Sequence, residues 1–295
     1  MKHSKYKSVI CMLTSLLLAI FISVISLAVA IRLGFASNNS LVKALDDVHY
    51  YDMVYDSFTE KCESVLIPDG LDVKVLDGAF SKEQLRSDGN DYFKAQLNST
   101  TFNVNTFIYK QKLQDNINQY VNDNNLSVDG DRDKIISDIS DEIVNYYLDM
   151  IKIPYANTVS VIFRNIIKYF PLIVAPMVVM GAVCVFLLCV QNKRKKNRIF
   201  RYLAYSVMSG AITTIIPVIY SFSTGFYKKI QIYPVYVYKF MIRYLENGLK
   251  ILATVGIMLF IVALIMIFLS TYIKSRYLKE ARIHHHHHHH SEDDI

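Results

Sequence analysis

The chain has 295 residues, of which 52% are hydrophobic, and its 32 Lys and Arg against 26 Asp and Glu give a formal net charge of +6. A mean hydropathy of +0.23 is high for a soluble domain in which 20% of the residues are charged, and it is typical of a chain with two different kinds of region. The apolar content excludes a disordered chain, 10 Gly exclude a collagen-like repeat, and 4 Cys exclude a disulfide-dense secreted miniprotein.

The first predicted element is a transmembrane helix at residues 9–33, which follows a short basic segment, residues 1–8. Residues 9–31 contain no Lys, Arg, Asp, Glu or His. About 20 apolar residues are enough to cross a hydrocarbon core roughly 30 Å thick. A cleaved signal peptide is the alternative, since Ala28 and Ala30 could serve a signal peptidase. The apolar stretch is longer than the roughly 7 to 15 residues of the apolar core of a signal peptide, which favours an uncleaved anchor.

Residues 34–168 are predicted to form a helical domain. Apolar residues recur every three or four positions over residues 41–65, which predicts one continuous helix there. Pro-Asp-Gly at 68–70 and Asp-Gly at 77–78 predict turns. The segment Ser-Lys-Glu-Gln at 81–84 fits a capping box and predicts a helix to about residue 97.

Two further helices are predicted in this domain, and no sustained strand alternation is present. The third helix covers about residues 103–122, and the fourth starts near Asp131 and ends before Pro154. Residues 155–168 are predicted to lead into the second span. The acidic run at 129–133 has two interpretations, a calcium loop or a helix cap. The cap is favoured because an EF-hand loop would need Gly and Glu where Lys134 and Ser140 stand.

Three more uncharged segments are predicted to cross the membrane, at residues 169–190, 202–222 and 251–273. A basic loop, residues 191–201, joins the second and third spans. Residues 223–250 join the third and fourth spans and are rich in Tyr and Phe. Because such rings favour the headgroup region, this loop is predicted to be an outer interfacial belt, with a ligand groove as the alternative.

The distribution of charge predicts the orientation. Lys and Arg concentrate at the N-terminus, in the loop at 191–201, which has six of them, and in the tail at 274–295, so all three are expected in the cytoplasm. Residues 34–168 have 13 basic and 21 acidic residues, a net charge of −8, and are expected to be extracytoplasmic. We therefore expect an all-α integral membrane protein with four transmembrane helices and a large helical extracytoplasmic domain between the first and second.

Two local clusters are candidate contact sites. The basic loop could bind lipid headgroups or a cytoplasmic partner, although its simpler role is to fix the topology; nucleic acid is not expected as a partner. Its residues are Lys193, Arg194, Lys195, Lys196 and Arg198. The tail has seven consecutive histidines that could bind a metal ion, as a native tract or as a purification tag. They are His284, His285, His286, His287, His288, His289 and His290.

The sequence predicts a binding role and no enzymatic one. It has no zinc-protease, nucleophile-elbow, phosphate-loop or dinucleotide motif, so no catalytic residue and no cofactor are expected. The cores of the spans have no Asp, Glu, Lys, Arg or His of the kind that transporters use. The outer domain has Cys62 as its single cysteine, and an outer domain without a disulfide favours the plasma membrane of a Gram-positive bacterium.

We therefore expect a multi-pass protein of the cell membrane whose outer domain senses or binds a protein, peptide or envelope component. The order of one span, an outer domain and three spans is similar in topology to the permease subunits of FtsX-like and MacB-like ABC systems, although no sequence motif carries that similarity. The resemblance implies the alternative, a transport or permease component working with a separate cytoplasmic ATPase.

Overall fold

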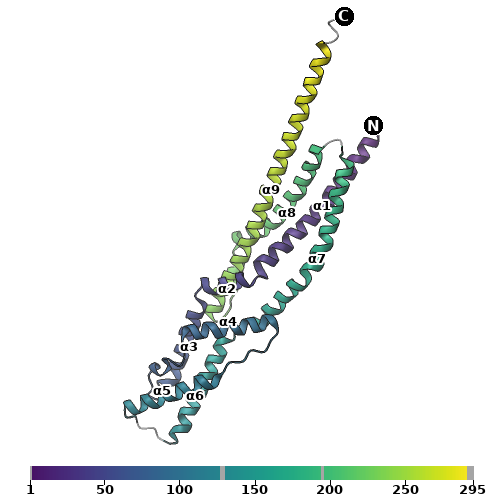
Figure 1. The fold of residues 1–295 in the computed structure, drawn as a ribbon. Helices are drawn as coiled ribbons and strands as arrows, with labels where there is room; N and C mark the ends of the chain where they lie inside the picture. The colour runs from purple at the N-terminus through teal and green to yellow at the C-terminus, as the bar shows by residue number, and fades with distance from the viewer. Residues whose placement is uncertain (1, 127–129, 194–195, 291–295) are drawn as a thin grey trace. The chain divides into compact units, whose positions relative to one another are not determined.

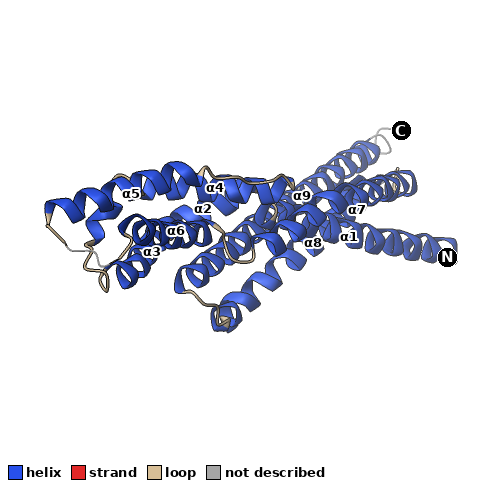
Figure 2. Cartoon of the chain, turned by 90° about the horizontal axis from the view of Figure 1, so that it is seen from below, coloured by secondary structure: helices blue, strands red, loops and turns tan. Residues whose placement is uncertain are grey.

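The computed structural model describes residues 2–126, 130–193 and 196–290, and in these ranges the regular structure is helical, with no strand (Figures 1 and 2). The all-α prediction is confirmed for this part of the chain. Contacts divide the chain into two compact units: residues 1–40, 166–230 and 245–295 form the first, and residues 41–165 and 231–244 the second. The α-helices are α1 (Lys2–Phe35), α2 (Asn38–Asp47), α3 (Tyr50–Leu66), α4 (Lys82–Asn98), α5 (Thr106–Asp123), α6 (Arg132–Ile151), α7 (Ala156–Gln191), α8 (Lys196–Thr224) and α9 (Val235–His290), and two 3-10 turns are η1 (Val73–Leu76) and η2 (Phe226–Lys229).

Four helical segments are long and apolar enough to cross a membrane: Ser8–Phe35, Arg132–Gln191, Lys196–Thr224 and Val235–Arg276. The four spans predicted from the sequence fall within these segments. Many of their large apolar side chains are exposed in the protein, for example Met12, Leu172 and Phe268 at about 70%. Contiguous exposed apolar surface is unfavourable in water, so these faces fit a lipid environment.

In the first unit, α1 and α8 pack through hydroxyl groups. The Ser15 and Ser206 hydroxyl oxygens lie 3.4 Å apart, and Ser206 donates a hydrogen bond of 2.9 Å to the Ser15 carbonyl. Further along the two helices, the Ser23 hydroxyl oxygen lies 3.3 Å from that of Ser209. Small hydroxyl residues let two helices approach closely and satisfy polar groups that lipid cannot. The first helix is therefore an integrated member of this bundle.

Glycines allow two other close approaches in the first unit. A Cβ on Gly34 of α1 would lie 3.0 Å from the carbonyl oxygen of Gly248 in α9, so the two backbones nearly touch. A Cβ on Gly256 of α9 would lie 2.5 Å from the Ile215 side chain of α8. The absence of a side chain at these positions permits the helix spacing.

The second unit confirms the helix caps predicted from the sequence. The Ser81 hydroxyl accepts a hydrogen bond of 3.1 Å from the Gln84 amide at the start of α4. Asp131 caps α6 by accepting from the Lys134 amide at 3.4 Å, as the cap interpretation of the acidic run requires. Such caps satisfy amide groups that have no partner within the helix.

The prediction of one continuous helix over residues 41–65 is wrong, because the chain turns between α2 and α3. His49 adopts a left-handed conformation with φ of 51°, and its amide donates to the Asp46 carbonyl at 3.0 Å. Among residues other than glycine, His is one of the types that tolerate this region. The apolar spacing persists through the turn because both helices bury their apolar face, so the pattern alone could not reveal the break.

The core of the second unit is aromatic. The Phe80 ring lies at 5.2 Å from that of Phe58, 4.9 Å from that of Tyr147 and 5.5 Å from that of Tyr109, so residues of α3, α5 and α6 meet around one ring. Phe58 and Tyr147 are fully buried. Clustered rings at these distances add to the stabilisation from burial alone.

Residues 231–244, expected as part of the interfacial loop, belong to this second unit. The Tyr50 ring of α3 lies 5.5 Å from the Tyr236 ring and 5.8 Å from the Phe240 ring, both in the first turns of α9. The Arg243 Nε forms an ion pair of 2.8 Å with Asp47. Phe240 is buried by protein contacts, so part of this aromatic segment has a structural role within the domain.

Candidate functional site

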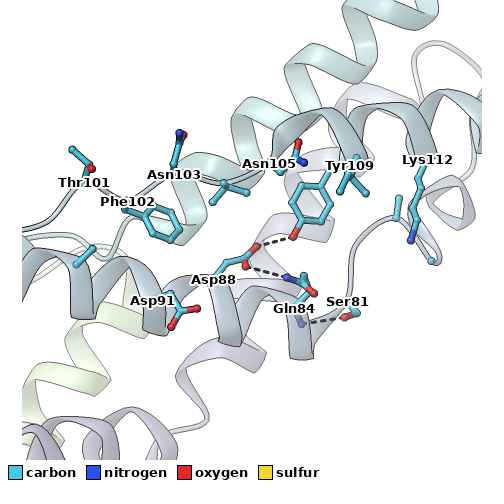
Figure 3. A pocket seen from close by; sticks show the side chains of 15 residues that line it. Ser81, Gln84, Asp88, Asp91, Thr101, Phe102, Asn103, Asn105, Tyr109 and Lys112 are labelled. Carbon is cyan, nitrogen blue, oxygen red and sulfur yellow. Dashed lines mark hydrogen bonds between the residues drawn. The ribbon is translucent and has the colours of Figure 1, made fainter.

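A cavity in the second unit has a volume of about 800 Å³ and lies between α4, α5 and the segment that joins them (Figure 3). The α4 residues that line it, Gln84, Asp88, Asp91 and Ala95, are four, three and four positions apart, so they lie on one side of the helix. The lining residues are Gly78, Ala79, Ser81, Gln84, Asp88, Asp91, Ala95, Thr101, Phe102, Asn103, Val104, Asn105, Ile108, Tyr109 and Lys112. A cavity of this size is in the range of binding sites for small ligands and short peptides.

Asp88 organises the wall of this cavity. Its Oδ2 accepts hydrogen bonds of 2.8 Å from the Tyr109 hydroxyl and 2.8 Å from the Tyr147 hydroxyl. Its Oδ1 accepts one of 3.0 Å from the Gln84 side-chain amide, and Figure 3 shows Asp88 between Gln84 and Tyr109. Hydrogen bonds to an ionised acceptor are stronger than neutral ones. Asp88 therefore ties α4 to α5 and α6 at the cavity wall.

The two phenols on Asp88 remain neutral donors at physiological pH. Burial, followed by the hydrogen bond to Asp88, raises the pKa of Tyr109 to about 12. The same two causes, burial first, raise the pKa of Tyr147 above its usual range. A phenolate beside a carboxylate would place two negative charges together, so the proton stays on each tyrosine.

The segment between α4 and α5, residues 101–105, belongs to no helix, and it ends in a turn at Asn105, where the Thr106 amide donates a hydrogen bond of 2.9 Å to the Val104 carbonyl. Side-chain exposure alternates along it: Thr101, Asn103 and Asn105 are exposed, whereas Phe102 and Val104 are half-buried. The amides of 101–105 and the carbonyls of 101–103 form no hydrogen bond with the described parts of the chain. Backbone polar groups of an extended segment are thus left open to solvent or to a ligand.

The start of this segment is held in place by contacts with α4 and α7. At its start, the Thr100 amide donates to the Ala95 carbonyl at 2.9 Å. The Arg164 guanidinium donates to the Gln96 carbonyl at 3.1 Å and also to the Ser99 hydroxyl, which fixes the end of α4 against α7. The Tyr92 and Phe102 rings, 5.4 Å apart, pack edge to face and hold the segment over α4.

A second, smaller cavity of about 370 Å³ lies beside the start of α3. His49 lines it, with its Nδ1 at 3.3 Å from an Asp52 carboxylate oxygen and a side chain that is 80% exposed. The adjacent Tyr50 hydroxyl is buried and has no hydrogen-bond partner among the described residues. His49 therefore has a structural explanation: its left-handed conformation forms the turn between α2 and α3.

The candidate contact residues from the sequence lie away from the larger cavity. Lys193, Lys196 and Arg198 are exposed at the α7–α8 connection, and residues 194–195 lie outside the described residues. The tract His284–His290 is at the end of α9, where the side chains lie outside the described part. In the part of the chain that the structure describes, no three His, Cys, Asp or Glu side chains gather as a metal site.

Sequence reasoning missed the cavity residues because their pattern has an ordinary explanation. Gln84, Asp88 and Asp91 form a polar stripe on α4, and a polar stripe is usually a solvated helix face. The available signal was the unusual run of Thr and Asn at 99–106 between two helices, which does not fit either helix.

Comparison with known proteins leaves the fold and this cavity as the basis for a functional argument. No protein-family model, no curated protein and no solved structure matches the chain.

Proposed function

We propose that this chain is a non-enzymatic, multi-pass membrane protein whose helical domain lies outside the cytoplasm and binds a protein, peptide or envelope component. The observation that carries the proposal is the cavity of about 800 Å³ between α4 and α5. It presents amides, hydroxyls, two carboxylates and one ammonium group, which is chemistry for recognising a polar ligand. In this proposal, the four apolar helices found among the described residues anchor the domain to the membrane.

The proposed topology follows from charge and is tested by labelling of single cysteines in intact cells. The net charge of −8 over residues 34–168 and the six basic residues at 191–201 favour an outer domain and a cytoplasmic loop. We expect a membrane-impermeant maleimide to label Ser99→Cys in intact cells, and Asn197→Cys only after permeabilisation. The reverse pattern would refute the orientation.

Ligand binding is tested with the full chain in lipid nanodiscs and two probe sets, a phage-displayed random decapeptide library and soluble peptidoglycan fragments. Asn103→Trp places a large side chain in the lining of the cavity, and Asn145→Trp places the same side chain at an exposed position of α6 as the matched control. We expect at least one probe set to contain ligands that bind the wild type and the Asn145 variant but lose at least tenfold affinity for the Asn103 variant.

Two results would overturn this function. One is the absence, in both probe sets, of any ligand that responds to Asn103→Trp. The other is a stable nucleotide-binding protein that co-purifies with the full chain and is released by neutralising the basic residues in 191–201. The second result would establish the permease component as the better description.

A further inference from the structure

The extended segment at residues 101–105 has the properties of an unpaired strand. Its amides and the carbonyls of 101–103 form no hydrogen bond with the described chain, and its side chains alternate between half-buried and exposed. Alternation with a period of two is the geometry of a β-strand, and the four residues before the turn at Asn105, at about 3.3 Å each, span about 13 Å. Unpaired backbone groups of this kind are a template for a second strand.

The segment borders the cavity, and contacts with α4 anchor its start, which restricts the conformations of its backbone. Phe102 packs on Tyr92, and the Thr100 amide is bonded to α4. A preformed strand loses little conformational freedom when a partner pairs with it, which favours binding. The cavity beside it gives room for the side chains of that partner.

The charge of the surroundings identifies the chemistry of the partner. Residues 34–168 have a net charge of −8, and Asp88 and Asp91 line the cavity against the single cation Lys112. Asp88 already accepts three hydrogen bonds. Asp91 is 58% exposed and has only a surface ion pair with Lys94, which contributes little, so its carboxylate is available to a cationic group.

We propose that residues 101–105 bind an extended, basic peptide by backbone pairing, with a Lys or Arg side chain of that peptide on the Asp91 carboxylate. This inference rests on the proposed function and names the ligand class for the same cavity. The peptide backbone supplies affinity, and the charge of its side chains supplies selectivity.

The backbone part of the proposal has a specific signature. Alternate amides of a strand point to opposite edges, so only every second amide of the peptide pairs with the segment. Decapeptides selected from the random library are resynthesised with N-methyl groups at either the odd or the even positions. We expect methylation of one set to weaken binding at least tenfold and methylation of the other set to change it less than threefold. Equal effects of both sets would overturn backbone pairing.

The charge part is tested with matched variants of the full chain. We expect Asp91→Asn to lower the binding affinity of the selected basic peptides at least fivefold, and we expect this difference in affinity to shrink at high salt. Asp138→Asn, on the exposed surface of α6, should change the affinity less than twofold. Selected peptides with no excess of Lys and Arg, or with equal responses to both variants, would overturn the basic-peptide assignment.

The two proposals fail differently. If peptidoglycan fragments bind in a manner that Asn103→Trp abolishes while no peptide binds, the basic-peptide inference is wrong and the proposed binding function remains. If no probe responds to Asn103→Trp, both are wrong.

Discussion

Tyr147 provides the most direct test of how the second unit is held together. Its ring is fully buried against Phe58 and Phe80, and its hydroxyl donates a hydrogen bond of 2.8 Å to Asp88. Tyr147→Phe keeps the ring and removes only the donor. Tyr146→Phe is the matched control in the adjacent position, because the Tyr146 hydroxyl bonds to Glu142 at 2.5 Å on the exposed surface.

The expected magnitudes follow from the acceptor and the burial. A buried hydrogen bond to a charged group contributes about 1.5–3 kcal/mol, so Tyr147→Phe should lower the free energy of unfolding by about 2 kcal/mol. An exposed pair one helical turn apart contributes about 0.5 kcal/mol or less, which sets the expectation for Tyr146→Phe. A change of about 2 kcal/mol raises the population of the open state roughly 30-fold.

Cys62 is a suitable probe of that open state. It is fully buried in α3, and burial raises the pKa of its thiol to about 12, so the folded domain reacts slowly with maleimides. The full chain, with its other three cysteines replaced by serine, is labelled in nanodiscs at several urea concentrations. The labelling rate then reports the fraction of open domain.

We expect a roughly 30-fold faster labelling of Cys62 in the Tyr147→Phe variant and at most a threefold change in the Tyr146→Phe variant. Equal rates for the two variants would show that the bond to Asp88 does not stabilise the domain. Such a result would also remove the physical reason for treating Asp88 as the organiser of the cavity wall.

Three further outcomes are expected from the structure. Because the pKa of Tyr109 is raised to about 12 in the folded domain, the unfolded domain loses this proton at a lower pH than the folded one. The neutral phenol therefore makes its full contribution to the free energy of unfolding below about pH 10, and this contribution is lost as the pH rises toward 12. Between these pH values, the labelling rate of Cys62 should rise less steeply with pH in Tyr109→Phe than in the wild type. The buried Tyr50 hydroxyl lacks a hydrogen-bond partner among the described residues, so Tyr50→Phe should leave the unfolding free energy unchanged or raise it by about 1 kcal/mol, in contrast to the Tyr147 variant. The contact between Ser15 and Ser206 predicts that cysteines at both positions form an oxidative cross-link between α1 and α8, detected on gels as a shift that reductant reverses.

Each of these outcomes has a contradicting result. An unchanged pH dependence in Tyr109→Phe would exclude that phenol as a contributor, and a loss of stability in Tyr50→Phe would show that its hydroxyl has a partner. For the cross-link, a cysteine at Ile20, which is 50% exposed on α1, paired with the same α8 position is the control. Cross-linking in the control pair alone would refute the packing of α1 on α8. Loss of the first helix from the purified chain would refute the prediction that this helix is an uncleaved membrane anchor.

Local patterns in the sequence were sufficient for the helices and their boundaries in several places. Uncharged segments of about 20 residues identify the four apolar helices because membrane thickness sets a length that few buried core helices need. The caps at Ser81 and Asp131 were also predictable, since a cap depends on residues three positions apart. The turn at His49 was not, because a short interruption left the apolar spacing of the two helices in phase.

The cavity and the assignment of residues 231–244 depended on contacts between distant parts of the chain. A polar stripe on α4 indicates only which side of the helix avoids the core. The hydrogen bonds that Asp88 accepts from Tyr109 and Tyr147 depend on the positions of α5 and α6, which the sequence pattern does not give. The aromatic residues at the start of α9 have the composition of a membrane-interface belt, and the packing of Tyr236 and Phe240 on Tyr50 also joins that part of the segment to the second unit. Composition and periodicity thus determined which residues are helical and which segments avoid water, because these properties depend on neighbours in sequence. The tertiary structure decided which surfaces pack against each other, because an apolar or aromatic surface can pack against many others and does not specify its partner.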